Sequence, residues 1–553
     1  MNKLTKSVKD NRTAEKTKAV VNYMGGTSYE LSALETLKMV TASSIFGEPQ
    51  YYRDGEFAQK GVADGIVKID TVFLAYSLFG GEVTGKKTSE FMEQVIDQAL
   101  EADFEGTIRW AKTLREDYFM RLNPQVIMVR AAMHPARVKF NEEHPGLFSE
   151  INQEVMARAD EPASQLTYYL FRNGSKASVP NVLKRNWAKR LENCSRYEVA
   201  KYKNAAVGMI DTVRISHAKG PVLDELMKTG TVKTQEDEKT WENLRSAGMS
   251  WKEILSSCKI GHMALLRNLR GIFSEIDDTG ICGEVIEKLK KGVPGGKQFP
   301  FRYWSAYKAI EHADGINHKP QLLDALEECI DISCGNMPTL KGKTMCLTDN
   351  SGSAWGAFNS EYGCVTVAEI DNLSSVIAAR NSEEGYVGKF GDKLVVKPVS
   401  KRNGVLLQTK EITKDRHDDV GGGTENGIWL FLDKAIREKE HWDNIFIFSD
   451  MQAGHGGLYG TQESILKYKE QGFVVRGMYI DVAKMIDAYR REVNPKVNVY
   501  CVQTAGYDNI LVPEYGYRTN LLYGWTGKEI VFADEMNRFW DAMDEKHKGN
   551  REP

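Results

Sequence analysis

The chain has 553 residues, of which 42% are hydrophobic and 27% charged, and its formal net charge is −3. These values are typical of globular proteins and predict two to four domains. The near-neutral charge does not indicate a nucleic-acid binder, and no apolar stretch is long enough to span a membrane. The polar start lacks the apolar segment of a signal peptide. Eight scattered cysteines without a Cys-x-x-Cys pair favour free thiols, so we expect a cytoplasmic protein.

Residues 1–340 are predicted to form successive helices. Their apolar periodicity indicates helices at 31–42, 89–102, 104–114, 180–192, 196–206, 264–273 and 303–312. Loops that contain Gly and Pro separate them, as at 292–296. No strict sequence repeat is visible. Antiparallel helices of this size can nevertheless stack as an α-solenoid, with about 40–47 residues in each pair and roughly seven or eight pairs in the region.

A locally basic segment lies within this helical part. Residues 172–219 contain 11 Lys and Arg but only three acidic residues, an excess that the charge of the whole chain conceals. One helix begins at Pro180, and Ser-Arg-Tyr-Glu at 195–198 fits a capping box that starts the next. A third helix ends before Gly220 and Pro221. Lys and Arg neutralise phosphates, and aromatic or His rings stack on unpaired bases. From composition alone, RNA binding and an ordinary solvated face are equally supported.

After Pro338 the pattern changes. Short β-branched and apolar runs alternate with helices; the runs are 344–348, 394–399, 442–449, 474–480 and 497–502, and the helices include 426–439 and 462–471. This alternation is typical of a doubly wound α/β sheet. We therefore predict two domains, a helical one over residues 1–340 and an α/β one over residues 341–553.

Polar residues at the end of the first of these strands form an Asp-x-Ser-x-Ser pattern. Asp349, Ser351 and Ser353 place three oxygen donors at the carboxyl edge of the sheet, where open α/β sheets bind ligands. Thr424 follows three glycines, and Asp450 ends a second apolar run. A small divalent cation such as Mg²⁺ prefers an octahedron of such oxygens, some of them from water. The order and spacing of these residues therefore indicate a metal site.

Two other interpretations of this segment must be weighed. Ser and Gly can form a tight strand-to-helix turn with Asp349 as its N-cap, although this leaves Thr424 and Asp450 unexplained. A phosphatase usually needs a second acid two residues after the first, to protonate the leaving group, and position 351 is Ser. The carboxylates for two-metal hydrolysis are not evident either, because Asp349 and Asp450 suffice for one ion. We expect a binding site that does not catalyse a reaction.

The metal-site pattern resembles the metal-ion-dependent adhesion site of von Willebrand factor type A domains. The helical part resembles the TROVE module of the Ro ribonucleoprotein family, whose members pair a ring of HEAT-like helices with a type A domain. The matching stretches are Gly-Gly-Thr-Ser-Tyr at 25–29, Glu-Val-Ala-Lys-Tyr-Lys at 198–203, Arg-Ile-Ser-His-Ala-Lys at 214–219, Met-Ala-Leu-Leu-Arg-Asn-Leu at 263–269 and Pro-Phe-Arg-Tyr at 300–303. The resemblance implies a HEAT-like solenoid closed into a ring. It also implies metal ligation, directly or through water, by Asp349, Ser351, Ser353, Thr424 and Asp450.

The same resemblance implies an RNA-binding function. Members of the family bind small noncoding Y RNAs on the outer surface of the ring and single-stranded ends of misfolded or structured RNAs in its central hole, for RNA quality control or decay. By motif match, Lys201, Lys203 and His217 would contact Y-like RNA, with Arg214 on the same surface. Ala205 stands where the family can carry an Arg. Charges on the preceding helix would then compensate, namely Lys184, Arg185, Lys189 and Arg190.

A second class of function is a metal-dependent scaffold for protein interactions. Its metal site would capture an acidic side chain of a partner, such as an exoribonuclease, and the helices would only support that site. The two functions can coexist because the RNA and metal features lie in different predicted domains. A metal-dependent hydrolase is a third and least supported class, because position 351 lacks the second acid.

Overall fold

The structure is a computed structural model, and it describes residues 19–21, 27–29, 33–42, 88–174, 176–202, 208–233, 240–356, 366–422, 426–449, 470–475, 479–480, 482–504, 517–523, 527 and 529–548. The described chain is mostly helical and contains one six-stranded mixed sheet. This agrees with the expectation of a helical part followed by an α/β part. Among the described helices, none combines the length and apolarity needed to cross a bilayer. The seven described cysteines are free thiols, as expected.

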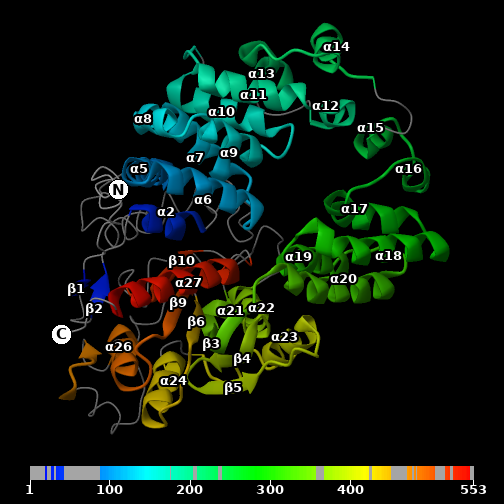
Figure 1. Cartoon of the computed structure of the whole chain (residues 1–553). Coiled ribbons are helices and arrows are strands. Elements are labelled where there is room, and N and C mark those ends of the chain that lie inside the picture. Colours follow the sequence, from blue (N-terminus) through cyan, green and yellow to red (C-terminus); the bar gives the residue numbers. More distant parts are fainter. Residues whose placement is uncertain are drawn as a thin grey trace.

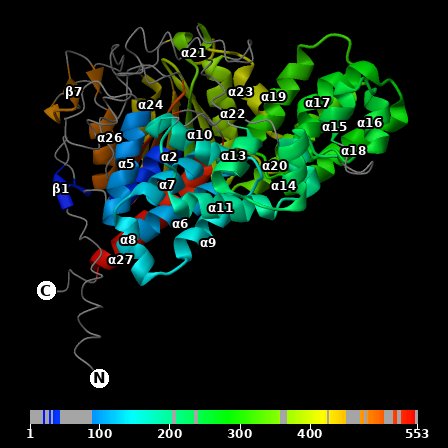
Figure 2. The ribbon, with the colours of Figure 1, turned by 90° about the horizontal axis from the view of Figure 1, so that it is seen from above.

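The helices before the sheet follow one another along an arc (Figures 1 and 2). In chain order they are α2 (Ala33–Ala42), α5 (Thr88–Ala102), α6 (Phe104–Glu116), α7 (Leu122–Met133), α8 (Ala136–Glu143), α9 (Leu147–Val155), α10 (Glu161–Asn173), α11 (Asn181–Glu192), α12 (Arg196–Tyr202), α13 (Met209–Ser216), α14 (Pro221–Thr229), α15 (Trp241–Ser246), α16 (Trp251–Ser257), α17 (His262–Glu275), α18 (Thr279–Gly296), α19 (Pro300–Glu311) and α20 (Lys319–Ser333). A short 3₁₀ turn, η2 (Cys334–Asn336), leads to the sheet, and the short strands β1 (Ala19–Val21) and β2 (Thr27–Tyr29) pair antiparallel near the start of the chain.

Helix α6 illustrates why these segments are helical. The side chain of Asp103 accepts a hydrogen bond from the N–H of Gly106, which caps the free end of the backbone ladder. The buried residues Ile108, Ala111 and Leu114 follow at intervals of three, so one face of the helix is apolar and packs into the core.

The sheet has the strand order β10-β9-β6-β3-β4-β5. Its strands are β3 (Leu340–Asp349), β4 (Ser382–Phe390), β5 (Leu394–Pro398), β6 (Asn444–Ser449), β9 (Asn498–Gln503) and β10 (Thr519–Tyr523). All neighbours pair in parallel except β4 and β5, so β5 is an antiparallel edge strand. The chain runs outward from β3 in one direction through β4 and in the other through β6. The boundary between β3 and β6 is therefore the point at which the strand order reverses, where such sheets bind ligands.

Helices surround this sheet and bury its central strands. They are α21 (Gly352–Gly356), α22 (Val367–Arg380), α23 (Val405–Thr413), α24 (Asn426–Arg437), α26 (Val482–Glu492) and α27 (Glu529–Lys548). Every residue of β6 is buried, which requires helices or loops on both of its faces. Helix α22 packs along β3 and β4, and α24 lies against β4 and β5.

The structure corrects some of the sequence predictions in this half of the chain. Residues 474–480 do not form one strand: β7 (Val474–Val475) and β8 (Tyr479–Ile480) pair antiparallel with each other, apart from the main sheet. The strand predicted from 442 begins at Asn444. Strands β4 and β10 were not predicted, because Gly and charged residues in β4 and Asn in β10 hide the apolar pattern. The predicted helix 462–471 falls almost entirely outside the described residues.

Both ends of the helical arc contact the sheet and its helices. At one end, Lys38 of α2 pairs with Glu535 of α27 at 3.3 Å. At the other, Arg380 of α22 pairs with Asp331 of α20 at 2.8 Å, and the arc helix α20 packs against α23. Near these ends, the segment after α6 also contacts the residue before α19, because the rings of Phe119 and Phe299 lie 5.7 Å apart.

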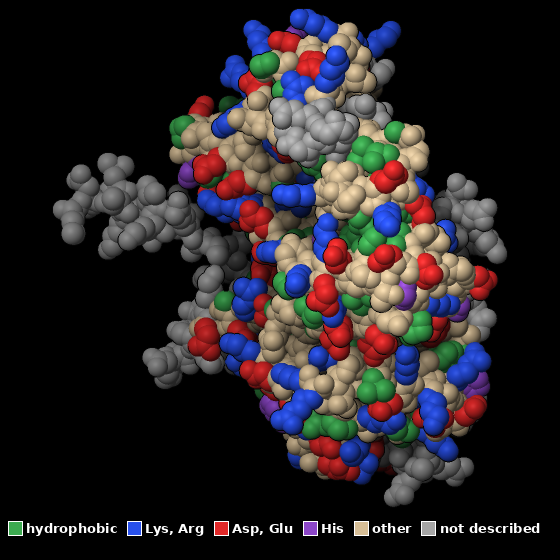
Figure 3. Space-filling model, turned by 90° about the vertical axis from the view of Figure 1, so that its right-hand side faces the viewer, with side chains coloured by type: hydrophobic (Ala, Val, Ile, Leu, Met, Phe, Trp, Pro, Cys, Tyr) green, Lys and Arg blue, Asp and Glu red, His purple; other side chains and the backbone are tan. Residues whose placement is uncertain are grey.

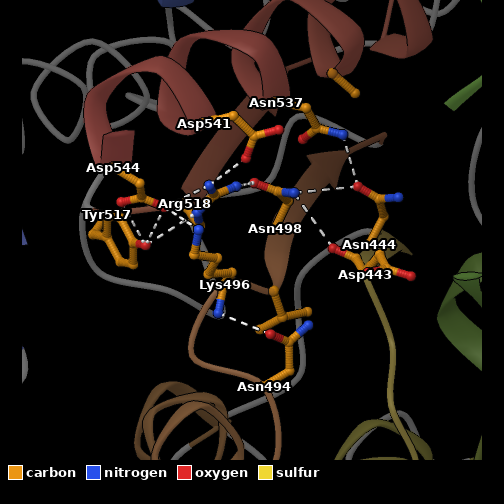
Figure 4. A network of polar contacts seen from close by, with 12 residues as sticks. Asp443, Asn444, Asn494, Lys496, Asn498, Tyr517, Arg518, Asn537, Asp541 and Asp544 are labelled. Atoms are coloured by element: carbon orange, nitrogen blue, oxygen red, sulfur yellow. Dashed lines mark hydrogen bonds and ion pairs between the residues drawn. The ribbon is translucent and has the colours of Figure 1, made fainter. Parts of the chain in front are cut away.

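A buried arginine fastens the C-terminal helix to the amino edge of the sheet (Figure 4). Arg518, which is 1% exposed, immediately precedes β10 and contacts Asp541 and Asp544 of α27. It also donates to Asn498, the first residue of β9, at 2.8 Å. Burial disfavours the guanidinium charge, but the hydrogen bonds to Asp544 and Asp541 outweigh burial and raise the pKa of Arg518.

We predict that Arg518→Ala destabilises the protein by about 3–5 kcal/mol, because it removes a buried cation that bonds Asp541, Asp544 and Asn498 and leaves Asp544 only its weaker contact with Lys496. Urea unfolding followed by tryptophan fluorescence measures the change. The matched control is Arg538→Ala, which removes an exposed arginine of α27 that pairs with Asp534. This substitution should cost less than about 1 kcal/mol. Equal effects of the two substitutions would contradict the structural role of Arg518.

Candidate functional site

The carboxyl edge of the sheet carries the first candidate site, at the point where the strand order reverses. Asp349 ends β3, is fully buried, and uses both carboxylate oxygens. The hydroxyl of Ser449, at the end of β6, donates to its Oδ2, and the backbone N–H of Ser351 donates to its Oδ1 at 2.9 Å. Two neighbouring parallel strands thus bring a carboxylate and two hydroxyl-bearing residues, Ser351 and Ser449, to one edge of the sheet.

A third loop reaches the same place. The N–H of Gly352 donates to the carbonyl of Gly422 at 2.9 Å, so Gly422 lies against the Asp-x-Ser-x-Ser loop. Gly421, at φ +83°, has a left-handed conformation that favours glycine. Thr424 and Asp450 lie outside the described residues, as does the side chain of Ser353. Their ligand roles stay predictions.

Asn350 and Asn372 form a buried amide pair that supports this loop and that the sequence did not reveal. The Nδ2 of Asn350 donates to Oδ1 of Asn372 at 2.8 Å, and the Nδ2 of Asn372 donates back at 3.0 Å. The hydroxyl of Thr348 donates to the same Oδ1 at 2.8 Å. Because Asn372 lies on α22, far along the chain from Asn350, only the tertiary structure shows that the two amides meet. The network fixes the backbone on both sides of Asp349.

The donor set at this edge suits a hard divalent cation. Carboxylate and hydroxyl oxygens are the ligands that Mg²⁺ prefers, and Asp349, Ser351 and Ser449 are all fully buried. No group of three His, Cys, Asp or Glu that could hold a metal occurs among the described residues, which do not include Asp450. The bond from Ser351 to Asp349 belongs to a simple turn as well, but the turn does not account for the contact with Ser449.

The second candidate site lies on helices α11–α14, which have a small core of their own. Leu191, Val199, Met209, Val213 and Leu226 belong to this core, which is separate from the main one. The predicted capping box is confirmed at the start of α12: the N–H of Glu198 donates to Ser195 Oγ at 3.2 Å, and the N–H of Ser195 donates to Glu198 Oε2 at 2.9 Å. In the space-filling view, Lys and Arg gather at the upper end of the molecule, over these helices (Figure 3).

The predicted RNA-contacting residues differ in how free their side chains are. Arg214 and His217 are exposed on α13 and at its end, where His217 has a left-handed backbone with φ 58°. Lys201 is half-buried and lies 5.5 Å from the rings of Tyr197 and Tyr202. Lys203 and Ala205 lie outside the described residues. The structure therefore brings Lys201 and Arg214 onto helices that share one core.

The compensating charges of α11 fall into two groups. Lys189 and Arg185 are exposed and Lys184 is half-buried. Arg190 instead holds the structure together: its Nε donates to the carbonyl of Met156 at 2.9 Å, and its Nη2 pairs with Glu198 at 2.8 Å. These bonds occupy the guanidinium, and Arg190 is the least available of the four for an RNA phosphate.

Comparisons with known proteins agree with this fold. Residues 225–327 match the family model of the TROVE domain. The crystal structure of the Ro (RSR) protein of Deinococcus radiodurans has a similar fold, with a TM-score of 0.59 at 14% sequence identity, over 84% of this chain and 99% of that one. A search of curated proteins finds no match.

The chain therefore carries a match to the TROVE domain, and its fold is similar to that of a Ro protein. The sequence motifs indicated a resemblance to the Ro ribonucleoprotein family, and the TROVE match and the fold agree with it. The TROVE match begins at Glu225 on α14, so it does not include Lys201, Arg214 or His217. The roles of these three residues stay predictions.

We predict that Mg²⁺ stabilises the protein through Asp349. At a Mg²⁺ concentration a hundredfold above Kd, binding to the folded state should raise the free energy of unfolding by about 2.7 kcal/mol. Asp349→Asn preserves the size of the side chain and should remove most of this gain, because a neutral amide is a weaker ligand. Thermal unfolding with and without Mg²⁺ measures the stabilisation, and calorimetric titration measures the affinity for Mg²⁺. Asp415→Asn, at an exposed carboxylate of the same domain, is the control. An unchanged response of Asp349→Asn would contradict the site.

Proposed function

We propose that this protein is a non-catalytic RNA-binding component of a Ro-type ribonucleoprotein. The observation that carries the proposal is the TROVE domain match on a chain with the fold of a Ro protein. Its RNAs would be a small noncoding Y-like RNA and the single-stranded ends of structured or misfolded RNAs. The complex would serve RNA quality control or decay in the cytoplasm.

The surface of α11–α13 is the proposed binding site for the Y-like RNA. Arg214 and His217 are exposed there, and Lys201 lies beside two tyrosine rings. Cationic groups next to aromatic rings suit RNA, because the cations neutralise phosphates while the rings stack on unpaired bases. Lys203, Lys184, Arg185 and Lys189 would extend the positive surface.

Single-stranded ends would enter the centre of a closed ring of HEAT-like helices. Two contacts support closure: the rings of Phe119 and Phe299 lie 5.7 Å apart, and the ammonium of Lys297 lies 5.6 Å from the Phe119 ring. These residues lie near opposite ends of the arc. A closed ring admits an unpaired strand more readily than a duplex, so it would select RNAs with free ends.

The sheet part would be a von Willebrand factor type A domain with a bound divalent metal, most simply Mg²⁺. Asp349, Ser351, Ser353, Thr424 and Asp450 would coordinate the ion, directly or through water. An open coordination position would then bind an acidic side chain of a protein partner such as an exoribonuclease. Catalysis is not proposed, because position 351 is Ser and leaves no second acid two residues after Asp349.

We predict that removing two charges from the proposed RNA surface weakens RNA binding. The variant Lys201→Gln/Arg214→Gln should bind a structured RNA with a single-stranded tail more weakly. It should also lower the slope of log K against log salt by about 1.4–1.8, because two phosphate contacts are lost. His217→Asn is tested separately, since Asn tolerates the left-handed backbone at that position. Filter binding over a range of salt concentrations measures both effects.

The matched control for this experiment is Lys401→Gln/Arg402→Gln, which removes two exposed charges from the sheet domain. It should leave affinity and salt slope almost unchanged. If the wild-type protein binds neither structured nor tailed RNA at low salt, the proposed function is wrong. If it binds RNA and the Lys201/Arg214 variant binds equally well, these residues are not the binding site.

The alternative function, a metal-dependent scaffold for protein interactions, is favoured by the burial of Asp349 at the edge where the strand order reverses. It predicts that Asp349→Ala loses a protein partner in pull-down experiments while RNA affinity is preserved. The Asp415→Ala variant should retain the partner. If Asp349→Ala keeps every Mg²⁺-dependent partner, the metal site does not recruit proteins.

A further inference from the structure

A pocket of about 490 Å³ lies between α8, α9 and α11, and it shares only Arg185 with the candidate RNA surface. The three helices lie together in Figures 1 and 2, and α9 packs against α11. Five polar or basic side chains line it, those of Arg137, Asn141, Ser149, Asn181 and Arg185, together with Pro145, Gly146, Pro180 and Val182. Its size is in the range of small-molecule sites, which run from about 300 to 1,000 Å³.

The charge of this pocket is positive. Two guanidinium groups line it, from Arg137 on α8 and Arg185 on α11, and no Asp or Glu does. Within the part of the chain that the structure describes, neither arginine has a carboxylate partner; Arg137 is positioned by a bond from its Nε to the carbonyl of Ala132 at 2.8 Å. By contrast, Arg130 on α7 and Arg172 on α10 are ion-paired. Two arginines left without acidic partners around one cavity are suited to bind an anion.

Backbone groups add to this positive field. The helices α9 and α11 both begin at the pocket, at Gly146 and Pro180, and neither has a side-chain cap. Among the described contacts, the first helical N–H groups of α11, at Asn181 and Val182, find no hydrogen-bond acceptor. Unpaired N–H groups and the helix dipole both favour a negative ligand, in support of the arginines.

We infer that this pocket binds a phosphate group of a nucleotide, and that in the ribonucleoprotein this nucleotide belongs to the bound RNA. The identification of the ligand as RNA rests on the proposed function. The anion-binding chemistry of the pocket does not depend on it. Arg185 lines the pocket, and Lys189 follows it on the same helix, which continues into the basic surface of α11–α13. An RNA strand lying on that surface would place a phosphate between Arg137 and Arg185, and Asn141 and Ser149 would supply further hydrogen bonds.

The test introduces a negative charge on either of two helices. Ser149→Asp acts on α9, outside the proposed RNA surface, and Asn181→Asp is an almost isosteric change at the start of α11. Both place a carboxylate in the first turn of a helix, where the dipole tolerates it, so the fold should be retained. Each should weaken binding of a tailed structured RNA by about tenfold or more, because the pocket then repels the phosphate. Asn403→Asp, an exposed isosteric change in the sheet domain, is the control and should have no such effect.

A second measurement tests ligand binding by the pocket independently of RNA binding. AMP should raise the thermal stability of the full-length wild-type protein, and Ser149→Asp and Asn181→Asp should abolish this shift. If the wild type binds RNA and the two variants bind RNA and respond to AMP as the wild type does, the inference is overturned while the proposed function stands. If AMP binds through the pocket but no RNA binds, the proposed function fails and the pocket is a mononucleotide site.

Discussion

An arc of stacked helices has two terminal faces, and each must be covered by something other than a further helix pair. In this protein the sheet domain covers both. Lys38 joins the first described helix to α27, and Asp331 joins α20 to α22. The contact of Phe119 with Phe299 joins the segment after α6 to the residue before α19. The position of α11–α13 relative to the sheet depends on these contacts, because they hold the two ends of the arc to one domain.

The sheet serves two purposes at its two edges. Its amino edge is closed by the buried Arg518, which ties β9 and β10 to the C-terminal helix. Its carboxyl edge instead gathers Asp349, Ser449 and the Gly352–Gly422 contact, with a buried amide pair behind them. Such a division is expected of a parallel sheet, since the loops that follow the strands all emerge on one side. The contacts of Arg518 therefore lie at the edge where no ligand is expected. At the opposite edge, the Asn350–Asn372 pair supports the loop that follows β3.

Sequence reasoning predicted the two-part architecture because long amphipathic helices and strand-helix alternation are local patterns. It also located Asp349 correctly at the end of a strand. It missed β4 and β10, whose residues do not alternate, and it assigned 474–480 to one strand when two short strands pair there. Asn372 and Arg518 could not be recognised from sequence, because their importance comes from partners far along the chain. Arg190 belonged to a basic run, yet its bonds to Met156 and Glu198 become visible only in three dimensions.

The contrast between Arg190 and Arg185 shows how the structure distinguishes charges that the sequence treats alike. Both lie on α11, and composition gives them the same weight. Arg190 faces Glu198 and a backbone carbonyl, so an RNA phosphate would have to displace those partners before binding it. Arg185 lines a cavity without acidic residues, at the start of the same helix. The local charge excess of the basic segment is therefore an overestimate of the charge available to RNA, and the available part lies toward the start of α11 and the exposed side of α13.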